Sequence, residues 1–177
     1  VPAAYHREEY EAEVGKILDV IKGFEDKYGG KIPVALAGGI YDHSDVMRAM
    51  ELGVDAVQVA TRFVTTEECD APLAYKQAYI NAKKEDIVIT KSPVGMPGRA
   101  IMNHFLENVG KTPLKLDWCY QCLEHCDRKT IPYCITKALI DAAEGDTENA
   151  LLFCGSNAYR AEKIETVPEV IRELCGE

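Results

Sequence analysis

Apolar residues recur at helical spacing near the start of the chain and then give way to short apolar runs. Over residues 7–28 they fall three or four positions apart, which predicts an amphipathic helix, and the glycine pair at 29–30 predicts its end. The run over residues 32–37 has no polar position. It therefore predicts a parallel strand that is buried on both faces.

The alternation of helix and strand continues as far as residue 82. Asp42 and Ser44 are both suitable N-caps for a second helix. Residues 55–59 predict a second strand, and Thr66 predicts the cap of a third helix that runs to about residue 82. Such alternation is typical of an α/β fold, in which right-handed crossovers make consecutive strands parallel. Two parallel strands need further neighbours to cover their faces and edges, so we expect the rest of the sheet to come from elsewhere.

The pattern changes after residue 82. Residues 86–90 predict a short strand, and residues 91–98, with two prolines and two glycines, predict a loop. Residues 100–109 predict a helix. Pro132 is suited to open a further helix, and Thr166 predicts the cap of a last one.

Composition and charge restrict the classes of partner. The chain has 177 residues, enough for one domain or part of a larger one, and a formal net charge of −9. The negative charge argues against nucleic acid and anionic lipid, although main-chain N–H groups can still hold an anionic cofactor locally. No apolar run reaches the roughly 18 residues of a membrane helix, and no signal peptide is visible. We expect a cytoplasmic protein, cut from a longer chain because it begins at Val1 in loop-like sequence.

Two turns, each after an expected strand, carry the first candidate site. One is Ala37-Gly38-Gly39-Ile40, and the other lies at Ala60-Thr61. In an α/β barrel the loops after the last two strands, with a helix N-terminus, form an anion site. The pair of turns therefore predicts a site for the phosphate of a cofactor. A tight strand-to-helix turn without a ligand remains the alternative for either turn.

Polar residues near these turns have two interpretations each. Gln58 interrupts an apolar strand, and its amide either bonds within the core or donates near the carboxyl end of the strand. Arg62 either reaches a phosphate or pairs with an acid, and we favour the acid. His43 is expected to help cap a helix. The segment of Tyr159 and Arg160 either approaches a cofactor or packs in the fold.

Four cysteines lie close together in the second half of the chain: Cys119, Cys122, Cys126 and Cys134. Clustered cysteines without an export signal indicate thiols or a metal rather than disulfides. They could hold zinc or an iron–sulfur cluster, and His125 could replace one ligand. Their spacing matches neither a standard zinc ribbon nor the bacterial ferredoxin run, and reduced thiols packed in a compact loop are the alternative.

Taken together, the segments resemble the NAD(P)H-dependent flavin oxidoreductases. This family includes the nitronate monooxygenases (2-nitropropane dioxygenases) and the flavin-type enoyl-acyl-carrier-protein reductases. The matching residues are 33–40, 49–53, 58–63, 98–100 with Asn103, and 151–160. The resemblance extends over nearly the whole chain but only over the C-terminal half of the family's fold.

The resemblance implies the C-terminal part of a TIM (β/α)8 barrel with a smaller, mainly helical appended domain. Residues 1–85 would be the last βα units, 86–150 the appended domain, and 151–177 a return to the barrel. The barrel would bind FMN and accept electrons from NAD(P)H. The remaining N-terminal half of the barrel would be a partner of this chain, and the oligomeric state, a homodimer included, stays open.

The resemblance also assigns the cofactor site. It implies that Gly38, Gly39, Ala60 and Thr61 hold the FMN phosphate and that Gln58 and Val59 lie near the flavin. The family usually has glycine where this chain has Ala60. Its catalytic histidine belongs to a Gly-Gly-His segment that this chain lacks, so we assign no catalytic residue.

Three functions follow. The first is an FMN-dependent oxidoreductase that oxidises NAD(P)H, nitronates or both, which would be inactive as this fragment alone. The second is an FMN-type enoyl-acyl-carrier-protein reductase. The third is a metal-binding or electron-relay module built on a phosphate-binding barrel, which the presence of zinc or iron would reveal.

Overall fold

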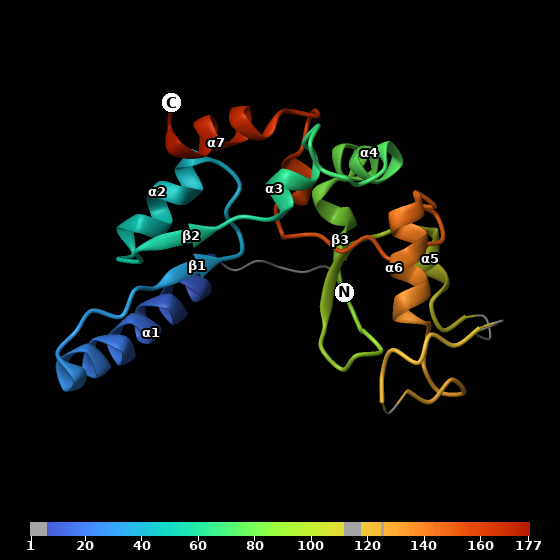
Figure 1. Ribbon diagram of the computed structural model, residues 1–177, viewed down its shortest axis with the longest axis horizontal. Coiled ribbons are helices and arrows are strands. Elements are labelled where there is room, and N and C mark those ends of the chain that lie inside the picture. The colour runs from blue at the N-terminus through green and yellow to red at the C-terminus, as the bar shows by residue number, and fades with distance from the viewer. Residues whose placement is uncertain (1–6, 112–117, 125) are drawn as a thin grey trace.

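The computed structural model describes residues 7–111, 118–124 and 126–177. Figure 1 shows two groups of elements joined by the short helix α3. In chain order the elements are α1 (Arg7–Tyr28), β1 (Ala35–Ala37), α2 (His43–Glu51), β2 (Ala56–Gln58), α3 (Thr61–Val64), α4 (Leu73–Asn81), the 3-10 turn η1 (Lys84–Asp86), β3 (Ile87–Thr90), β4 (Gly98–Ile101), α5 (His104–Asn108), α6 (Ile135–Glu144), the 3-10 turn η2 (Ala158–Arg160) and α7 (Val167–Cys175). No helix among these residues is both long and apolar enough to cross a bilayer.

The first group is built around the parallel pair β1 and β2. Leu36 of β1 lies opposite Val57 of β2, and both pack with α1 and α2 around Val14 and Ala49. The mixed α/β character and the parallel pairing are therefore confirmed.

The same strands are exposed on their other face, so the predicted burial of both faces is not found within the described residues. Ala35 and Ala37 of β1, and their register partners Ala56 and Gln58 of β2, are all exposed. The reason is that helices cover only one face of this sheet within the described residues. A run without polar positions does not reveal how many neighbouring strands are present.

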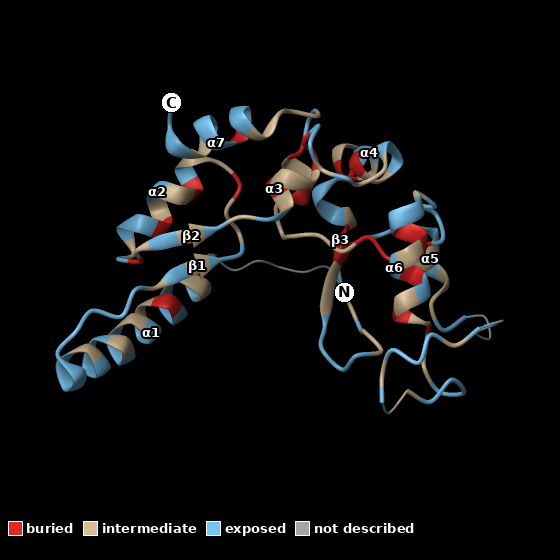
Figure 2. Ribbon diagram, in the orientation of Figure 1, coloured by how far each residue is buried: buried red, intermediate tan, exposed pale blue. Residues whose placement is uncertain are grey.

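The second group is built around the antiparallel hairpin of β3 and β4. Its core contains Ala100, Tyr133, Ala138 and Leu151, which bring β4, α6 and the segment after α6 together. Figure 2 shows the buried residues concentrated where α6 and α4 face the hairpin. The predicted strand and the predicted loop after it are confirmed, because β3 runs into the loop that returns as β4.

The last helix, α7, returns to the first group. It packs against α2 and α3, and Figure 1 shows it above α2. Thr166 caps it as predicted, since its side chain accepts from the Glu169 N–H and the Glu169 carboxylate accepts from the Thr166 N–H.

The helix predicted from Thr66 begins instead at Leu73. Thr66 forms an isolated parallel bridge with Glu165, and its hydroxyl donates to the Phe63 carbonyl. Pro72 then precedes α4 as its N-cap. Because proline disfavours the helical conformation of the residue before it, the helix cannot extend further back through this position. Tertiary pairing with a segment far along the chain decided the conformation of Thr66.

The predicted helix over 100–109 is wrong in its first part. Ala100 lies in β4, where it pairs with Val88 and forms a bridge to Phe153. The helix α5 begins only after Asn103, whose side chain accepts from the Leu106 N–H.

The helix expected to open at Pro132 begins later, at Ile135. The side chain of Tyr133 is buried and packs edge-on against Phe105, with ring centroids 5.2 Å apart. This contact accounts for the non-helical start, because the chain must bring Tyr133 inward before α6 begins.

Candidate functional site

The first candidate turn connects β1 to α2 and depends on two glycines. Gly38 and Gly39 have φ values of 97° and 77°. Only glycine adopts such angles in succession without steric cost, so the tight turn requires this pair. Asp42 caps α2 and forms a capping box with Asp45, as the sequence indicated.

The second turn connects β2 to α3, and it meets the first turn at one cavity. The cavity has a volume of about 140 Å³. On the same measure a water molecule needs about 10–15 Å³, so a group the size of a phosphate has room here. The cavity is lined by Ala37, Gly38, Gly39, Ile40, Gln58, Val59, Ala60, Thr61, Arg99, Gly155, Ser156 and Asn157. The structure thus brings all six predicted cofactor-binding residues together.

Several main-chain donors around this cavity are free. The N–H groups of Gly38, Gly39, Ile40 and Ala60 have no hydrogen-bond acceptor within the described part of the chain. Gly39 and Ile40 are half-buried, whereas Gly38 and Ala60 are exposed and can bond to water. Half-buried main-chain N–H groups are nearly always bonded, so the unpaired donors of Gly39 and Ile40 favour a ligand with acceptor oxygens.

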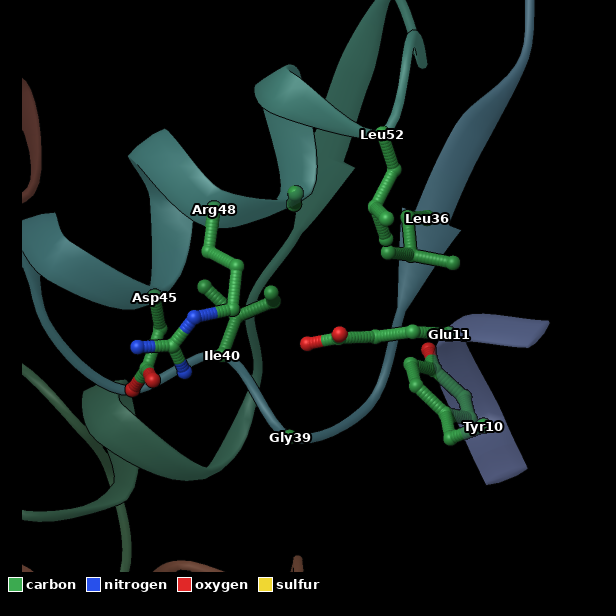
Figure 3. A pocket seen from close by; sticks show the side chains of 9 residues that line it. Tyr10, Glu11, Leu36, Gly39, Ile40, Asp45, Arg48 and Leu52 are labelled. Atoms are coloured by element: carbon green, nitrogen blue, oxygen red, sulfur yellow. The ribbon is translucent and has the colours of Figure 1, made fainter. Parts of the chain in front are cut away.

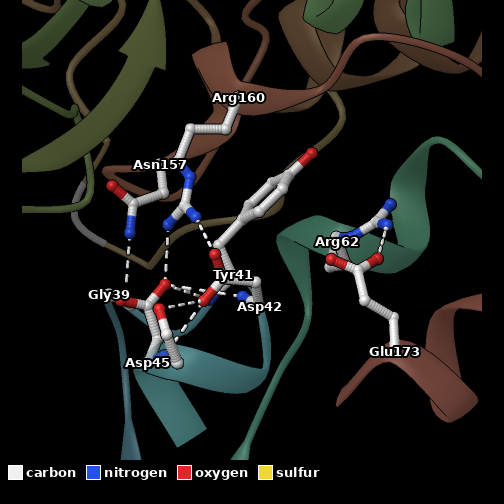
Figure 4. A network of polar contacts seen from close by, with 9 residues as sticks. Gly39, Tyr41, Asp42, Asp45, Arg62, Asn157, Arg160 and Glu173 are labelled. Atoms are coloured by element: carbon white, nitrogen blue, oxygen red, sulfur yellow. Dashed lines mark hydrogen bonds and ion pairs between the residues drawn. The ribbon is translucent and has the colours of Figure 1, made fainter. Parts of the chain in front are cut away.

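The third wall of the cavity comes from the segment after α6. The Gly155 N–H donates to the Thr61 hydroxyl oxygen at 2.9 Å, and the Asn157 side-chain amide donates to the Gly39 carbonyl at 2.7 Å. Figure 4 shows Asn157 reaching down to Gly39. The sequence Gly155-Ser156-Asn157 is typical of a turn, but the residues that the turn contacts are visible only in three dimensions.

Gln58 lies at the carboxyl end of β2 and is exposed on the uncovered face of the sheet. Within the described residues, its side chain is therefore not part of a core. The residue lines the cavity, which leaves its amide accessible to a ligand.

A network of charged side chains holds the first turn to the C-terminal segment. The Arg160 guanidinium pairs with Asp45 at 2.6 Å and also with Asp42. It lies over the Tyr41 ring, 4.7 Å from the centroid, and the Arg62 guanidinium lies 5.0 Å from the same centroid. Figure 4 shows Arg160 with Asp42 and Asp45 at the N-terminus of α2, and Arg62 apart from them beside Glu173. Arg160 thus has a packing role, which was one of its two predicted interpretations.

Arg62 pairs with acids, as we favoured from the sequence. Its guanidinium contacts Glu165 and Glu173, each at 2.5 Å, and its side chain is only 4% exposed. Burial by itself lowers the pKa of Arg62, but the hydrogen bonds to the two carboxylates outweigh burial and raise that pKa. His43 does not cap α2 with its side chain, because its Nδ1 lies 3.0 Å from the Leu174 carbonyl at the end of α7.

Acid is expected to weaken the contact between Asp42 and its partners. Burial raises the pKa of Asp42, but the Ser44 hydroxyl, the Asp45 N–H and Arg160 outweigh burial and hold that pKa below its usual range. The ionised carboxyl therefore stabilises the fold above about pH 4, and this contribution is lost as the pH falls through the folded pKa.

Urea unfolding at about pH 6 and about pH 3 tests this expectation. The free energy of unfolding should fall on acidification, and it should fall less in Asp42→Asn. Asp19→Asn, at an exposed position on α1, is the control and should lose as much as the wild type. Equal losses in Asp42→Asn and the wild type would contradict the role of Asp42.

A second, smaller cavity lies on the other side of the first turn. Figure 3 shows Tyr10 and Glu11 of α1 facing Arg48 of α2 and Leu52, the residue after α2, around it. Its volume is about 20 Å³, which suits one water and excludes a cofactor. The Tyr10 hydroxyl donates to the Ala37 carbonyl at 3.1 Å, so α1 contacts the start of the first turn.

The four cysteines are free thiols in a segment with little regular structure. Desolvation raises the pKa of Cys126, and the nearby thiols Cys119, Cys122 and Cys134 raise it further. Within the described residues, which omit His125, no three His, Cys, Asp or Glu side chains have an arrangement that could hold a metal. The zinc or iron–sulfur site stays a prediction, and elemental analysis of the purified protein tests it.

Paired βα units with two turns around one cavity define an α/β protein with a pocket at the carboxyl ends of its parallel strands, the place where open α/β folds commonly bind ligands. The family model for nitronate monooxygenase matches residues 5–177, and the chain belongs to this family. The resemblance inferred from the sequence is confirmed.

Curated and solved relatives agree with this membership. A probable nitronate monooxygenase of Staphylococcus aureus (strain Newman) is 37% identical over 98 residues, which are 55% of this chain and 25% of that protein. FabK from Thermotoga maritima has a TM-score of 0.68 and 26% identity, over 92% of this chain and 46% of FabK. Nitroalkane oxidase from Streptomyces ansochromogenes has a TM-score of 0.66 and 22% identity, over 98% of this chain and 46% of the oxidase. The chain thus matches a quarter to a half of the length of these relatives.

Proposed function

We propose that this chain is the FMN-phosphate-binding part of a flavin-dependent oxidoreductase that oxidises nitronates, NAD(P)H or both. The observation that carries the proposal is the shared cavity, because two turns from adjacent parallel units surround it with unpaired N–H groups. Main-chain N–H groups at such turns are suited to phosphate oxygens. Membership of the nitronate monooxygenase family supports the choice of reaction.

The residues present fit FMN. Gly38 and Gly39 lack side chains that would keep a phosphate away, and Ala60 adds only a methyl group on the facing turn. Gln58 would lie toward the flavin ring, where its exposed amide can donate or accept a hydrogen bond. When bound, the flavin supplies the redox chemistry, and the chain positions the cofactor. No residue of this chain is assigned as catalytic.

The uncovered face of the sheet supports a larger barrel. The exposed positions are mostly alanines on β1 and β2, and they form one continuous face in register. Small apolar residues on an uncovered sheet face are suited to packing against other elements, because parallel sheets are normally covered on both sides. We therefore propose that further strands complete a TIM barrel around this face, with the β3–β4 group as the appended domain. The cytoplasm, where NAD(P)H is available as electron donor, is the proposed location.

The protein encoded by the complete open reading frame tests the proposal. We expect it to bind FMN, to appear yellow, and to consume oxygen when an alkyl nitronate is added. A Gly39→Val variant should lose the flavin, because valine is strained at positive φ. Gly30→Val, in the open loop after α1, is the matched control. A colourless protein that binds no FMN would contradict the proposed function.

The similarity to FabK favours a second candidate, an FMN-type enoyl-acyl-carrier-protein reductase. Both candidates use the same cofactor site, so flavin binding does not separate them. NAD(P)H oxidation that depends on an enoyl thioester, measured without oxygen, would identify the reductase. Oxygen consumption that depends on a nitronate would identify the monooxygenase.

A further inference from the structure

One charged side chain lines the cavity between the two turns, and it belongs to Arg99 of β4. The other lining residues that the structure describes are neutral. The donors that the turns provide are likewise neutral N–H groups. A phosphate monoester carries close to two negative charges near pH 7. In a chain with a net charge of −9, a local positive charge beside such a group would strengthen its binding.

The Arg99 guanidinium is available for this purpose. Its Nε is buried and has no hydrogen-bond partner among the residues that the structure describes. Arg62 and Arg160, two other arginines near the turns, each pair with two carboxylates instead. A buried, unpaired donor of an ionised group is costly, so its position beside a cavity indicates that a ligand completes it.

The backbone holds Arg99 firmly at this wall. Arg99 pairs with Ile89 across the β3–β4 hairpin, and the Arg99 carbonyl accepts from the Cys154 N–H at 2.9 Å. The neighbouring Gly98 packs directly under the Phe153 ring, where an added Cβ would lie 2.3 Å from a ring carbon. The segment that contains Phe153 and Cys154 continues to Gly155, whose N–H donates to Thr61 of the second turn. Arg99 is therefore fixed relative to both turns.

We propose that Arg99 supplies the positive charge for the cofactor phosphate and selects the phosphorylated flavin over riboflavin. This inference rests on the proposed function. Charge-assisted hydrogen bonds are about twice as strong as neutral ones, and the planar guanidinium matches two phosphate oxygens at once. The turns would fix where the phosphate lies, and Arg99 would determine how much its charge contributes to binding.

Binding of FMN and of riboflavin, followed by quenching of flavin fluorescence, tests the inference on the complete protein. Arg99→Gln should weaken FMN binding by about 10- to 100-fold, the usual range for a hydrogen bond to a charged group. Riboflavin binding should change less than about twofold, because riboflavin has no phosphate. Arg99→Lys should recover part of the loss, since lysine restores the charge without the planar fork. Inorganic phosphate should compete with FMN in the wild type and much less in Arg99→Gln.

Arg172→Gln, on the exposed side of α7, changes the net charge equally and should leave both affinities unchanged. Equal losses of FMN and riboflavin binding in Arg99→Gln would overturn the inference, because a structural role would weaken both. Unchanged FMN binding would also overturn it. If Arg99→Gln does not fold, Arg99→Lys decides, since the loss of the planar fork should weaken FMN binding while riboflavin binding stays unchanged. A wild type that binds neither flavin would instead contradict the proposed function.

Discussion

Replacing Gly155 with alanine is expected to separate the C-terminal segment from the second turn and to weaken FMN binding at least about tenfold. An added Cβ would lie 2.4 Å from the Thr61 hydroxyl oxygen and 3.3 Å from the Thr61 Cβ. The Gly155 N–H donates to the same hydroxyl oxygen, so moving the two residues apart would break this hydrogen bond. Overpacking of this kind typically costs about 1–3 kcal/mol. Flavin fluorescence and urea unfolding measure the two effects.

Two variants make the Gly155 result specific. Gly30→Ala adds the same methyl group where nothing lies within 4 Å, so it should change neither flavin binding nor stability. Thr61→Ala in the Gly155→Ala background removes the oxygen that clashes and should recover part of the stability, although not the hydrogen bond. A Gly155→Ala protein with wild-type affinity for FMN would show that the close approach to Thr61 does not shape the cavity.

Replacing Arg62 with methionine is expected to lower the free energy of unfolding by about 3–5 kcal/mol, because it leaves two carboxylates without their cation. The side chain of Glu165 is 14% exposed, so its charge would stay largely buried. Glu173 is more exposed and contributes less. The loss should be measured by urea unfolding near pH 7.

An exposed ion pair provides the matched control for Arg62. Lys16→Met breaks the pair with Glu13, in which both side chains are more than 60% exposed, and it should cost at most about 1 kcal/mol. Glu165→Gln combined with Arg62→Met should recover part of the stability, since it removes the stranded charge. An Arg62→Met protein that is as stable as Lys16→Met would contradict the importance of this network.

The candidate site joins segments that are far apart in the sequence. The bond from Gly155 to Thr61 spans 94 residues, and the bond from Asn157 to Gly39 spans 118. The two expected effects at Gly155 and Arg62 therefore share one physical cause. The two turns are held in place by the C-terminal return of the chain, through a tight contact at Gly155 and a buried ion pair at Arg62.

Local chemistry made several features predictable. The bounds of α1 follow from its apolar spacing, and the caps at Asp42 and Thr166 follow from side chains that accept main-chain N–H groups. The glycine pair at 38–39 marked a turn that other residues cannot form. Each of these features depends on interactions within a few residues, and it can therefore be predicted from the sequence.

The errors arose where distant pairing overrode local preference. Thr66 has the features of a helix cap but bridges to Glu165, and Ala100, a good helix former, lies in a strand. Exposure of β1 and β2 likewise depended on which elements lie beside them. No local pattern predicted that Arg99 lines the cavity, because its position depends on the β3–β4 hairpin and on contacts with the segment around Phe153.

The sequence by itself determined the order of helices and strands in the first group and the two turns at the ends of its strands. Their chemistry is local, because glycine conformations and caps depend only on neighbouring residues. Only the tertiary structure decided that the turns share a cavity, that Arg99 forms one of its walls, and that Arg62 and Arg160 pair with acids instead of lining it. Those outcomes depend on burial and on long-range contacts, which arise when the chain packs.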